Sequence, residues 1–273
     1  MPDVTRFAPS PTGYLHLGHA RAAFFAADHG RMLLRIEDID VSRCRPAFED
    51  GIREDLTWLG LTWPTPIRRQ SEHFPAYRAA VDRLRRDGLS YPCFCTRADI
   101  EREIAGAASA PHGPDGPLYP GTCRGLSEGD RARRVAAGEP HAWRLDLAAA
   151  ASAAGPLQWI DRARGPQTAT PEIFGDVVIA RKDIPASYHL ACVWDDALQG
   201  VTLVTRGNDL FSVTHVHRLL QALLGLPTPA YHHHDLLVAS DGRKFSKRDA
   251  GVTLRALREQ GRSPADVRQM ALA

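Results

Sequence analysis

The N-terminal part of the chain alternates between short apolar runs and helical patterns, and this alternation restricts the fold more than any other feature. Val4–Ala8 has a strand pattern that runs into a turn rich in proline and glycine, and residues 17–29 have helical periodicity. A second strand pattern at residues 32–36 and a second helical pattern at residues 46–59 follow. Strands that alternate with helices pack as a parallel sheet covered by helices. We therefore predict an α/β fold with a doubly wound parallel sheet of the Rossmann type.

Residues 90–180 interrupt this alternation. Short strand patterns recur there, and residues 106–121 are rich in alanine, proline and glycine, which favours a loop over a helix or a central strand. We predict that this interval is a small inserted subdomain between the first half of the catalytic domain, residues 1–89, and its second half, residues 181–239. A loop and a short helical segment at residues 240–273 follow.

Charge and composition exclude several classes of protein. The net charge of +2 gives no bulk attraction for nucleic acid, so any RNA contact must come from local clusters such as Arg131–Arg134. Five cysteines in 273 residues do not form a disulfide framework, and no run of about 18 apolar residues could cross a membrane. No signal peptide pattern precedes the first strand. We expect a cytoplasmic enzyme that does not bind a membrane and acts as a monomer.

The first predicted helix begins with two histidines, in the sequence His16-Leu17-Gly18-His19. The start of a helix carries unpaired backbone N–H groups and a partial positive charge, which favour a phosphate group. His16 and His19 lie three residues apart and can face the same phosphate, while Gly18 lets a nucleotide approach the backbone closely. The motif indicates a nucleotide site, although two ordinary surface histidines would give the same short pattern.

A second motif, Lys-Phe-Ser-Lys-Arg, occupies residues 244–248. The Asp-Gly pair at residues 241–242 favours a tight turn before it. Lysine side chains act as mobile point charges, and phosphoryl chemistry depends mainly on positioning and charge stabilisation. We therefore expect Lys244 and Lys247 to bind a departing pyrophosphate, although the segment taken alone also suits a solvated basic loop.

Together these motifs resemble those of the catalytic domain of glutamyl-tRNA synthetases. The similarity runs from Thr5 to about Arg248 and includes Arg-Phe-Ala-Pro-Ser-Pro-Thr-Gly at residues 6–13 and Arg-Ile-Glu-Asp at residues 35–38. The histidine and lysine motifs correspond to the HIGH and KMSKS signatures of class I aminoacyl-tRNA synthetases, and both histidines, both lysines and the serine are retained. The resemblance implies a class I Rossmann fold and an enzyme that activates a carboxylate with ATP.

Only 25 residues follow Arg248, too few for the helical region that reads the anticodon in glutamyl-tRNA synthetases. Stand-alone domains of this kind transfer glutamate to queuosine at the wobble position of tRNA(Asp). The resemblance therefore implies L-glutamate, ATP and the anticodon stem-loop of tRNA(Asp) as partners, with Mg²⁺ on the ATP phosphates. Two alternatives stay open: a shortened glutamyl-tRNA synthetase that charges tRNA(Glu), and a nucleotidyltransferase with the same His-x-Gly-His motif.

The resemblance also implies roles for individual residues. Those implied for glutamate binding are Arg6, Ala8, Ser10, Glu37, Tyr188 and Arg206. Those implied for ATP binding are His16, Gly18, His19, Lys244, Ser246 and Lys247. The histidines and lysines among them would also be the catalytic residues, because they would stabilise charge on the phosphates.

The chemistry of glutamate agrees with these residue types. Its two carboxylates suit bidentate arginines such as Arg6 and Arg206, and its ammonium group suits the carboxylate of Glu37. Tyr188 and Ser10 can add neutral hydrogen bonds. Arginines in proteins also commonly form structural ion pairs. The candidate partners of Arg206 in that alternative are Asp195, Asp196 and Asp209.

Three cysteines in the predicted subdomain suggest a metal site. Cys93, Cys95 and Cys123 bracket the loop, and a structural zinc ion takes four ligands in a tetrahedral arrangement. The resemblance implies Tyr119 as the fourth ligand, and His112 is the alternative. Buried free cysteines are also ordinary in proteins, so zinc is a prediction that the spacing supports but does not require.

Overall fold

The computed structural model describes residues 2–106, 112–114, 116–237 and 253–272. The lysine motif, with the expected site residues Lys244, Ser246 and Lys247, lies outside these ranges. None of the helices within them combines the length and the apolar character that a membrane span requires.

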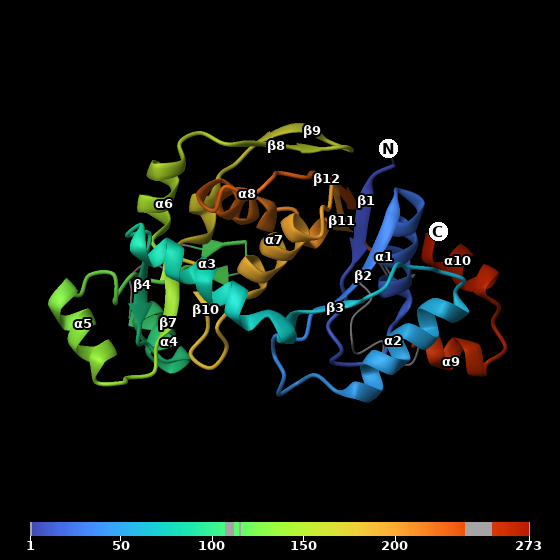
Figure 1. Ribbon diagram of the computed structural model, residues 1–273, viewed down its shortest axis with the longest axis horizontal. Coiled ribbons are helices and arrows are strands. Elements are labelled where there is room, and N and C mark those ends of the chain that lie inside the picture. Colours follow the sequence, from blue (N-terminus) through green and yellow to red (C-terminus); the bar gives the residue numbers. More distant parts are fainter. Residues whose placement is uncertain (1, 107–111, 115, 238–252, 273) are drawn as a thin grey trace.

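A parallel sheet forms the centre of the catalytic domain (Figure 1). Strand β1 (Val4–Phe7) pairs in parallel with β2 (Arg31–Ile36), and β2 pairs in parallel with β3 (Arg68–Arg69). The predicted α/β fold with a parallel sheet is therefore confirmed in its first half. Gly30 precedes β2 where the backbone comes close to Asp3, and a Cβ at Gly30 would lie 2.5 Å from the Asp3 carbonyl oxygen.

The second half of the sheet lies beside β1. Strand β11 (Leu203–Gly207) pairs in parallel with β12 (Ala230–His234), and Thr202, just before β11, donates its backbone N–H to the carbonyl of Val4. Strand β12 pairs in parallel with β8 (Gln158–Asp161), which forms an antiparallel pair with β9 (Gly165–Thr168). The central sheet therefore includes residues from the interval 90–180.

Helices cover the sheet where the sequence predicts them. Helix α1 (Leu17–Asp28) and α2 (Pro46–Trp58) each end within one residue of the predicted position, and α7 (Tyr188–Leu198) follows in the second half of the domain. Helix α3 (Phe74–Arg86) follows a 3₁₀ turn, η1 (Gln70–His73). This layer also contains the 3₁₀ turn η3 (Asn208–Leu210) and helix α8 (Val213–Leu223).

A separate antiparallel sheet lies at the opposite end of the molecule from the chain termini (Figure 1). Its strands, in spatial order, are β10 (Val178–Ala180), β7 (Ala142–Leu145) and β4 (Ser90–Cys93). The elements around it are α4 (Arg97–Gly106), β5 (His112–Gly113), β6 (Gly116–Pro117), α5 (Glu128–Ala136), α6 (Leu147–Ala154) and η2 (Pro171–Phe174). Residues 90–180 thus supply strands to two sheets, and the predicted domain boundaries stay a prediction.

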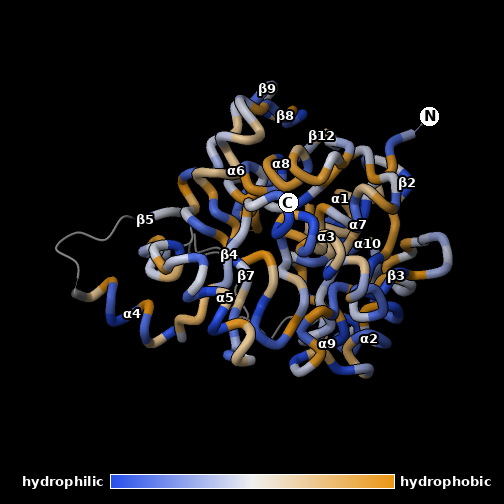
Figure 2. Tube along the Cα trace, turned by 60° about the vertical axis from the view of Figure 1, so that its left-hand side comes forward, coloured by the Kyte–Doolittle hydropathy of each residue, from blue (hydrophilic) through white to orange (hydrophobic). Residues whose placement is uncertain are grey.

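Hydrophobic residues are concentrated between these layers. One core lies between α1, α2 and the first half of the sheet, and a second joins α3, α6, α7 and α8. Figure 2 shows the contrast between α8, which carries a hydrophobic stretch, and α5, which is largely hydrophilic and buries none of its residues.

The last two helices, α9 (Leu254–Glu259) and α10 (Pro264–Leu272), pack against α1 and α2 (Figure 1). Leu257 and Val267 are buried there, and Arg21 of α1 donates to the carbonyl of Ala271. Just before α9, Thr253 forms a β-bridge with His16. The chain therefore returns to the histidine motif directly after residue 252.

We predict that Leu257→Ala lowers the free energy of unfolding by about 2–4 kcal/mol, because Leu257 is 3% exposed and its loss leaves a cavity between α9 and the first core. Denaturant-induced unfolding measures this change. The matched control is Leu198→Ala, at a side chain that is 63% exposed, which should cost less than about 0.5 kcal/mol. Equal effects of the two substitutions would mean that α9 contributes nothing to the stability of the domain.

Candidate functional site

A cleft of about 1690 Å³ opens at the carboxyl ends of the parallel strands β1, β2 and β11. Ligands of open α/β sheets bind at such a position. The cleft brings together all the residues expected to bind glutamate or ATP that the structure describes, and these are Arg6, Ala8, Ser10, His16, Gly18, His19, Glu37, Tyr188 and Arg206. Their individual roles stay predictions, but residues up to 200 positions apart in the sequence meet in one site.

The histidine motif forms the start of α1. The Nδ1 atom of His16 accepts the backbone N–H of Gly18 at 3.1 Å, and Nδ1 of His19 accepts the backbone N–H of His16 at 3.1 Å. Because Nδ1 accepts in both rings, each neutral imidazole carries its proton on Nε2, the tautomer that can donate to a phosphate oxygen. The two ring centroids lie 3.8 Å apart. A Cβ at Gly18 would lie 3.0 Å from the His16 ring, so a larger residue there would displace that ring.

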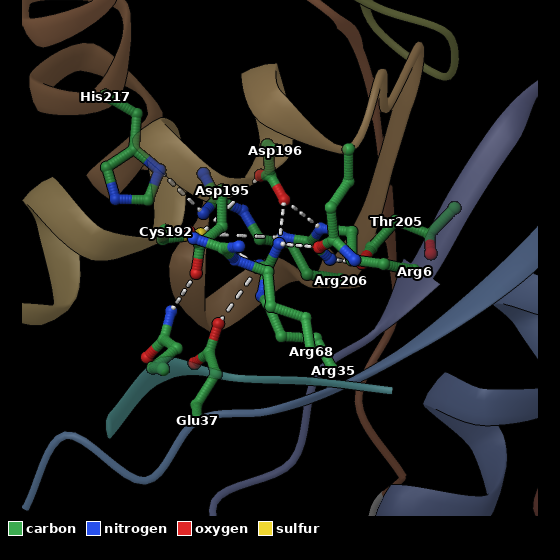
Figure 3. Close-up of polar contacts among 12 residues, drawn as sticks. Arg6, Arg35, Glu37, Arg68, Cys192, Asp195, Asp196, Thr205, Arg206 and His217 are labelled. Carbon is green, nitrogen blue, oxygen red and sulfur yellow. Dashed lines mark hydrogen bonds and ion pairs between the residues drawn. The ribbon is translucent and has the colours of Figure 1, made fainter. Parts of the chain in front are cut away.

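Buried ion pairs surround the expected amino-acid pocket (Figure 3). Asp196 of α7 accepts from Nε of Arg6 at 3.1 Å and from a terminal nitrogen of Arg35 at 2.8 Å, and Arg35 also pairs with Glu37 at 3.1 Å. Burial raises the pKa of Asp196, but the two adjacent guanidinium groups outweigh it and hold that pKa below its usual range. Burial raises the pKa of Glu37, and Arg35 only partly offsets it.

The neighbouring carboxylate, Asp195, accepts hydrogen bonds from a different set of residues. It accepts from Arg68 at 2.8 Å, from the side-chain amide of Gln70 at 3.0 Å and from the hydroxyl of Tyr77 at 2.8 Å. Two consecutive residues of α7 therefore hold different parts of the first half of the domain. Sequence reasoning assigned no such role to either aspartate, and an Asp-Asp pair in a helix gives no local signal of it.

Within the described ranges, Arg206 of β11 has only neutral partners. Its Nε donates to Nε2 of His233 at 3.1 Å, and its terminal nitrogens lie 3.3 Å from Nδ1 of His217 and 2.6 Å from the hydroxyl of Thr214. Among the residues that the structure describes, no carboxylate forms an ion pair with Arg206. The alternative that Arg206 forms a structural ion pair with Asp195, Asp196 or Asp209 is therefore wrong.

Other polar groups of the pocket come from β11 and α7. Tyr188 begins α7 and lines the cleft, and burial raises the pKa of its hydroxyl. Thr205 also lines the cleft, and within the described part of the chain its buried hydroxyl has no hydrogen-bond partner. Such a group needs a ligand or water to satisfy it. The sequence pattern of a buried strand does not distinguish Thr205 from its neighbours.

The cysteines of the second sheet form a compact cluster. The sulfur atoms of Cys93, Cys95 and Cys123 lie within 4.8 Å of one another, which suits a bound metal ion. The hydroxyl of Tyr119 lies 3.4 Å from the sulfur of Cys93 and 3.6 Å from that of Cys95. His112 pairs with Pro117 in the short β5–β6 sheet, and its side chain is exposed. Within the described residues, these three cysteines are the only such group of potential metal ligands.

Comparison with proteins of known sequence identifies the family of this chain. Residues 4–271 match the family model described as tRNA synthetases class I (E and Q), catalytic domain. A protein of Rhodobacter capsulatus called glutamyl-Q tRNA(Asp) synthetase is 49% identical, over 98% of this chain and 99% of its own. One of the same name from Nocardia farcinica is 46% identical, over 96% of this chain and 81% of its own.

Longer relatives match over a part of their length. A glutamate–tRNA ligase of Aquifex aeolicus is 39% identical over 95% of this chain and 54% of its own. The crystal structure of a glutamate tRNA ligase from Elizabethkingia meningosepticum, in complex with its amino acid, superposes with a TM-score of 0.74 at 28% identity. That match covers 92% of this chain and 53% of the other, so this chain spans about half of that protein. From the family model and these relatives, the chain belongs to the class I tRNA synthetases for glutamate and glutamine, as a catalytic domain.

Proposed function

We propose that this protein activates L-glutamate with ATP and transfers the glutamyl group to queuosine at the wobble position of tRNA(Asp). The observation that carries the proposal is that one cleft joins a phosphate-binding helix start to a pocket lined by buried arginines. The relatives that the chain matches over most of their length support the choice of queuosine, because they bear the name glutamyl-Q tRNA(Asp) synthetase.

The first step forms a mixed anhydride. An oxygen of the α-carboxylate of glutamate attacks the α-phosphorus of ATP, and the bond from that phosphorus to the bridging oxygen breaks, so that pyrophosphate leaves with the electron pair. The reaction needs no nucleophilic side chain. Negative charge increases on the phosphate oxygens, and the start of α1 with the Nε2–H groups of His16 and His19 would stabilise it.

Lys244 and Lys247 would bind the departing pyrophosphate, and Mg²⁺ on the phosphates would neutralise part of its charge. In the second step a hydroxyl oxygen of queuosine attacks the acyl carbon of the adenylate, and AMP leaves with the electron pair. The hydroxyl proton is lost to solvent or to the leaving phosphate. The product is a glutamyl ester of the tRNA.

The amino acid would bind among the charged groups at the inner end of the cleft. Glu37 uses one carboxylate oxygen for Arg35, and its other oxygen would accept from the substrate ammonium. Arg6 and Arg206 would hold the carboxylates, and Tyr188 and Ser10 would add neutral hydrogen bonds. A nucleotidyltransferase would not need this combination, and the family assignment also counts against that alternative.

We also propose that zinc binds to Cys93, Cys95, Cys123 and Tyr119 as a structural ion. Three sulfur atoms and one phenol oxygen supply the four ligands that a closed zinc site takes, and the distances among them favour Tyr119 over His112 as the fourth. The ion would tie Tyr119 and Cys123 to Cys93 and Cys95 at the end of β4 in the second sheet. We expect a cytoplasmic enzyme, because none of its five cysteines is paired in a disulfide. We also expect it to act as a monomer.

Adenylate formation can be measured as exchange of labelled pyrophosphate into ATP without tRNA. We predict exchange with glutamate and little with glutamine or aspartate. Lys247→Ala should reduce the rate by about 100-fold or more, since one group that stabilises transition-state charge is typically worth that much. Exchange that does not depend on an amino acid would contradict the proposal, and unchanged exchange in Lys247→Ala would remove that residue from the mechanism.

The acceptor can be identified by transfer of labelled glutamate to purified tRNA. We predict transfer to tRNA(Asp) that contains queuosine and none to the same tRNA with guanosine at the wobble position. The second tRNA is the matched control, because the two differ in one base only. Charging of tRNA(Glu) instead would establish the alternative, a glutamyl-tRNA synthetase.

The metal can be tested by elemental analysis of the purified protein. We predict about one zinc ion per chain, and a loss of most of it in Cys123→Ser, because a closed zinc site takes all four ligands. Cys44→Ser is the control, since Cys44 lies outside the cluster, and it should keep its zinc. A full zinc content in Cys123→Ser would exclude the proposed site.

A further inference from the structure

Arg206 differs from the other buried arginines around the pocket. Arg6 and Arg35 are neutralised by Asp196 and Glu37. Arg206 is 5% exposed. In the described part of the chain its guanidinium contacts His233, His217, Thr214 and the ring of Tyr231, and all four side chains are uncharged. An unpaired buried charge is costly, so proteins rarely retain one without a partner that arrives later.

The hydrogen bonds determine the state of both histidines beside Arg206. A guanidinium group can only donate, so Nε2 of His233 must accept, and so must Nδ1 of His217, which Figure 3 shows beside Arg206. Each ring therefore carries one proton, on its other nitrogen. An imidazolium, which has no acceptor, could not occupy either position.

Further contacts keep each ring in that tautomer. The Nδ1–H group of His233 donates to Asp161 at 2.6 Å, and the Nε2–H group of His217 faces Nδ1 of His189 at 3.4 Å. Asp161 of β8 is linked to Arg206 only through the His233 ring, which accepts from Arg206 at one nitrogen and donates to Asp161 from the other. Among the described residues, the guanidinium thus has hydrogen-bond partners on three sides and no adjacent counter-charge.

The burial of these rings agrees with their neutral state. Burial and the adjacent charge of Arg206 lower the pKa of His233 to about 4 and hold that of His217 well below its usual range. Burial likewise lowers the pKa of His189 to about 4. All three rings are therefore neutral at pH 7.

We infer that His217, His233 and Thr214 are positioning residues that hold Arg206 through neutral acceptors, and that this leaves its charge for the side-chain carboxylate of the substrate. The inference rests on the proposed function. It adds that selection of glutamate over glutamine depends on keeping a protein carboxylate away from Arg206. A bound glutamate neutralises the guanidinium, whereas a bound glutamine leaves it buried and uncompensated.

The geometry of the reaction indicates which carboxylate Arg206 receives. The α-carboxylate must attack the α-phosphate, so it has to lie towards the start of α1 with His16 and His19. Arg206 is enclosed by side chains of β12 and α8 at the inner end of the cleft. The other carboxylate of the substrate, on its side chain, is therefore the one that can reach it.

The test compares His217→Asp with His217→Asn. Both side chains place an oxygen near the position of Nδ1 and have nearly the same shape, but only aspartate brings a counter-charge to Arg206. Glutamate and glutamine are compared by pyrophosphate exchange, which gives KM and kcat for each variant. Binding of ATP without amino acid reports whether each variant is folded.

We expect His217→Asp to raise KM for glutamate about tenfold or more above that of His217→Asn, and to reduce the preference for glutamate over glutamine by a similar factor. The change in kcat should be smaller, because the reacting groups lie elsewhere in the cleft. Equal KM values and equal preferences in the two variants would overturn the inference. A purely structural role of His217 predicts that equality, because it would affect both variants alike.

A second matched pair covers the case in which His217→Asp does not fold. Thr214→Asp and Thr214→Asn repeat the comparison from another side of the guanidinium, and the same difference in KM and preference is expected. His141→Asp and His141→Asn, at a ring that does not line the cleft, should have equal KM values.

Exchange with glutamate by the unaltered enzyme distinguishes the proposed function from this inference. Its absence would contradict the proposed function. Normal exchange, together with equal KM values in the aspartate and asparagine variants, would contradict only this inference.

Discussion

The carboxylate of Asp196 connects the two halves of the catalytic domain, and the pocket depends on it. It is buried in α7 and binds Arg6 of β1 and Arg35 of β2, which lie 190 and 161 positions away in the sequence. Removing one partner of such a buried pair typically costs about 3–5 kcal/mol, because it leaves an uncompensated charge. The strand ends that form the cleft are therefore held in place by an interaction between charges rather than by apolar packing alone.

Much of the fold could be predicted from local sequence, because periodicity and turn residues are local signals. Helix α1, which begins at the histidine motif, and helix α2 end within a residue of their predicted bounds. The pairing of β8 with β12 could not be predicted in this way, since a short alternating strand gives no sign of its neighbour. The sequence indicated an inserted region there, whereas the structure adds residues 158–168 to the central sheet.

The candidate site was predictable where a motif carries the chemistry and unpredictable where tertiary contacts do. The resemblance to a known family supplied Arg6, Glu37 and Arg206, and the cleft brings them together. It did not supply His217 or His233, because a histidine in a helix or strand pattern is usually only a core residue. The choice between Tyr119 and His112 likewise needed distances, since spacing along a loop does not determine which side chain folds back onto the cysteines.

The two arginines of the pocket differ in what else depends on them. Arg6 and Arg35 share the carboxylate of Asp196, which connects the two halves of the domain. A substitution at Arg6 or Asp196 would therefore alter the stability of the domain and, on the proposed function, substrate binding as well. Arg206 is held by side chains of α8 and β12 that carry no ion pair with it. On the proposed function, amino-acid specificity can therefore diverge through the surroundings of Arg206 while the fold is preserved, and the Arg6 side of the pocket is the part that such divergence would have to leave unchanged.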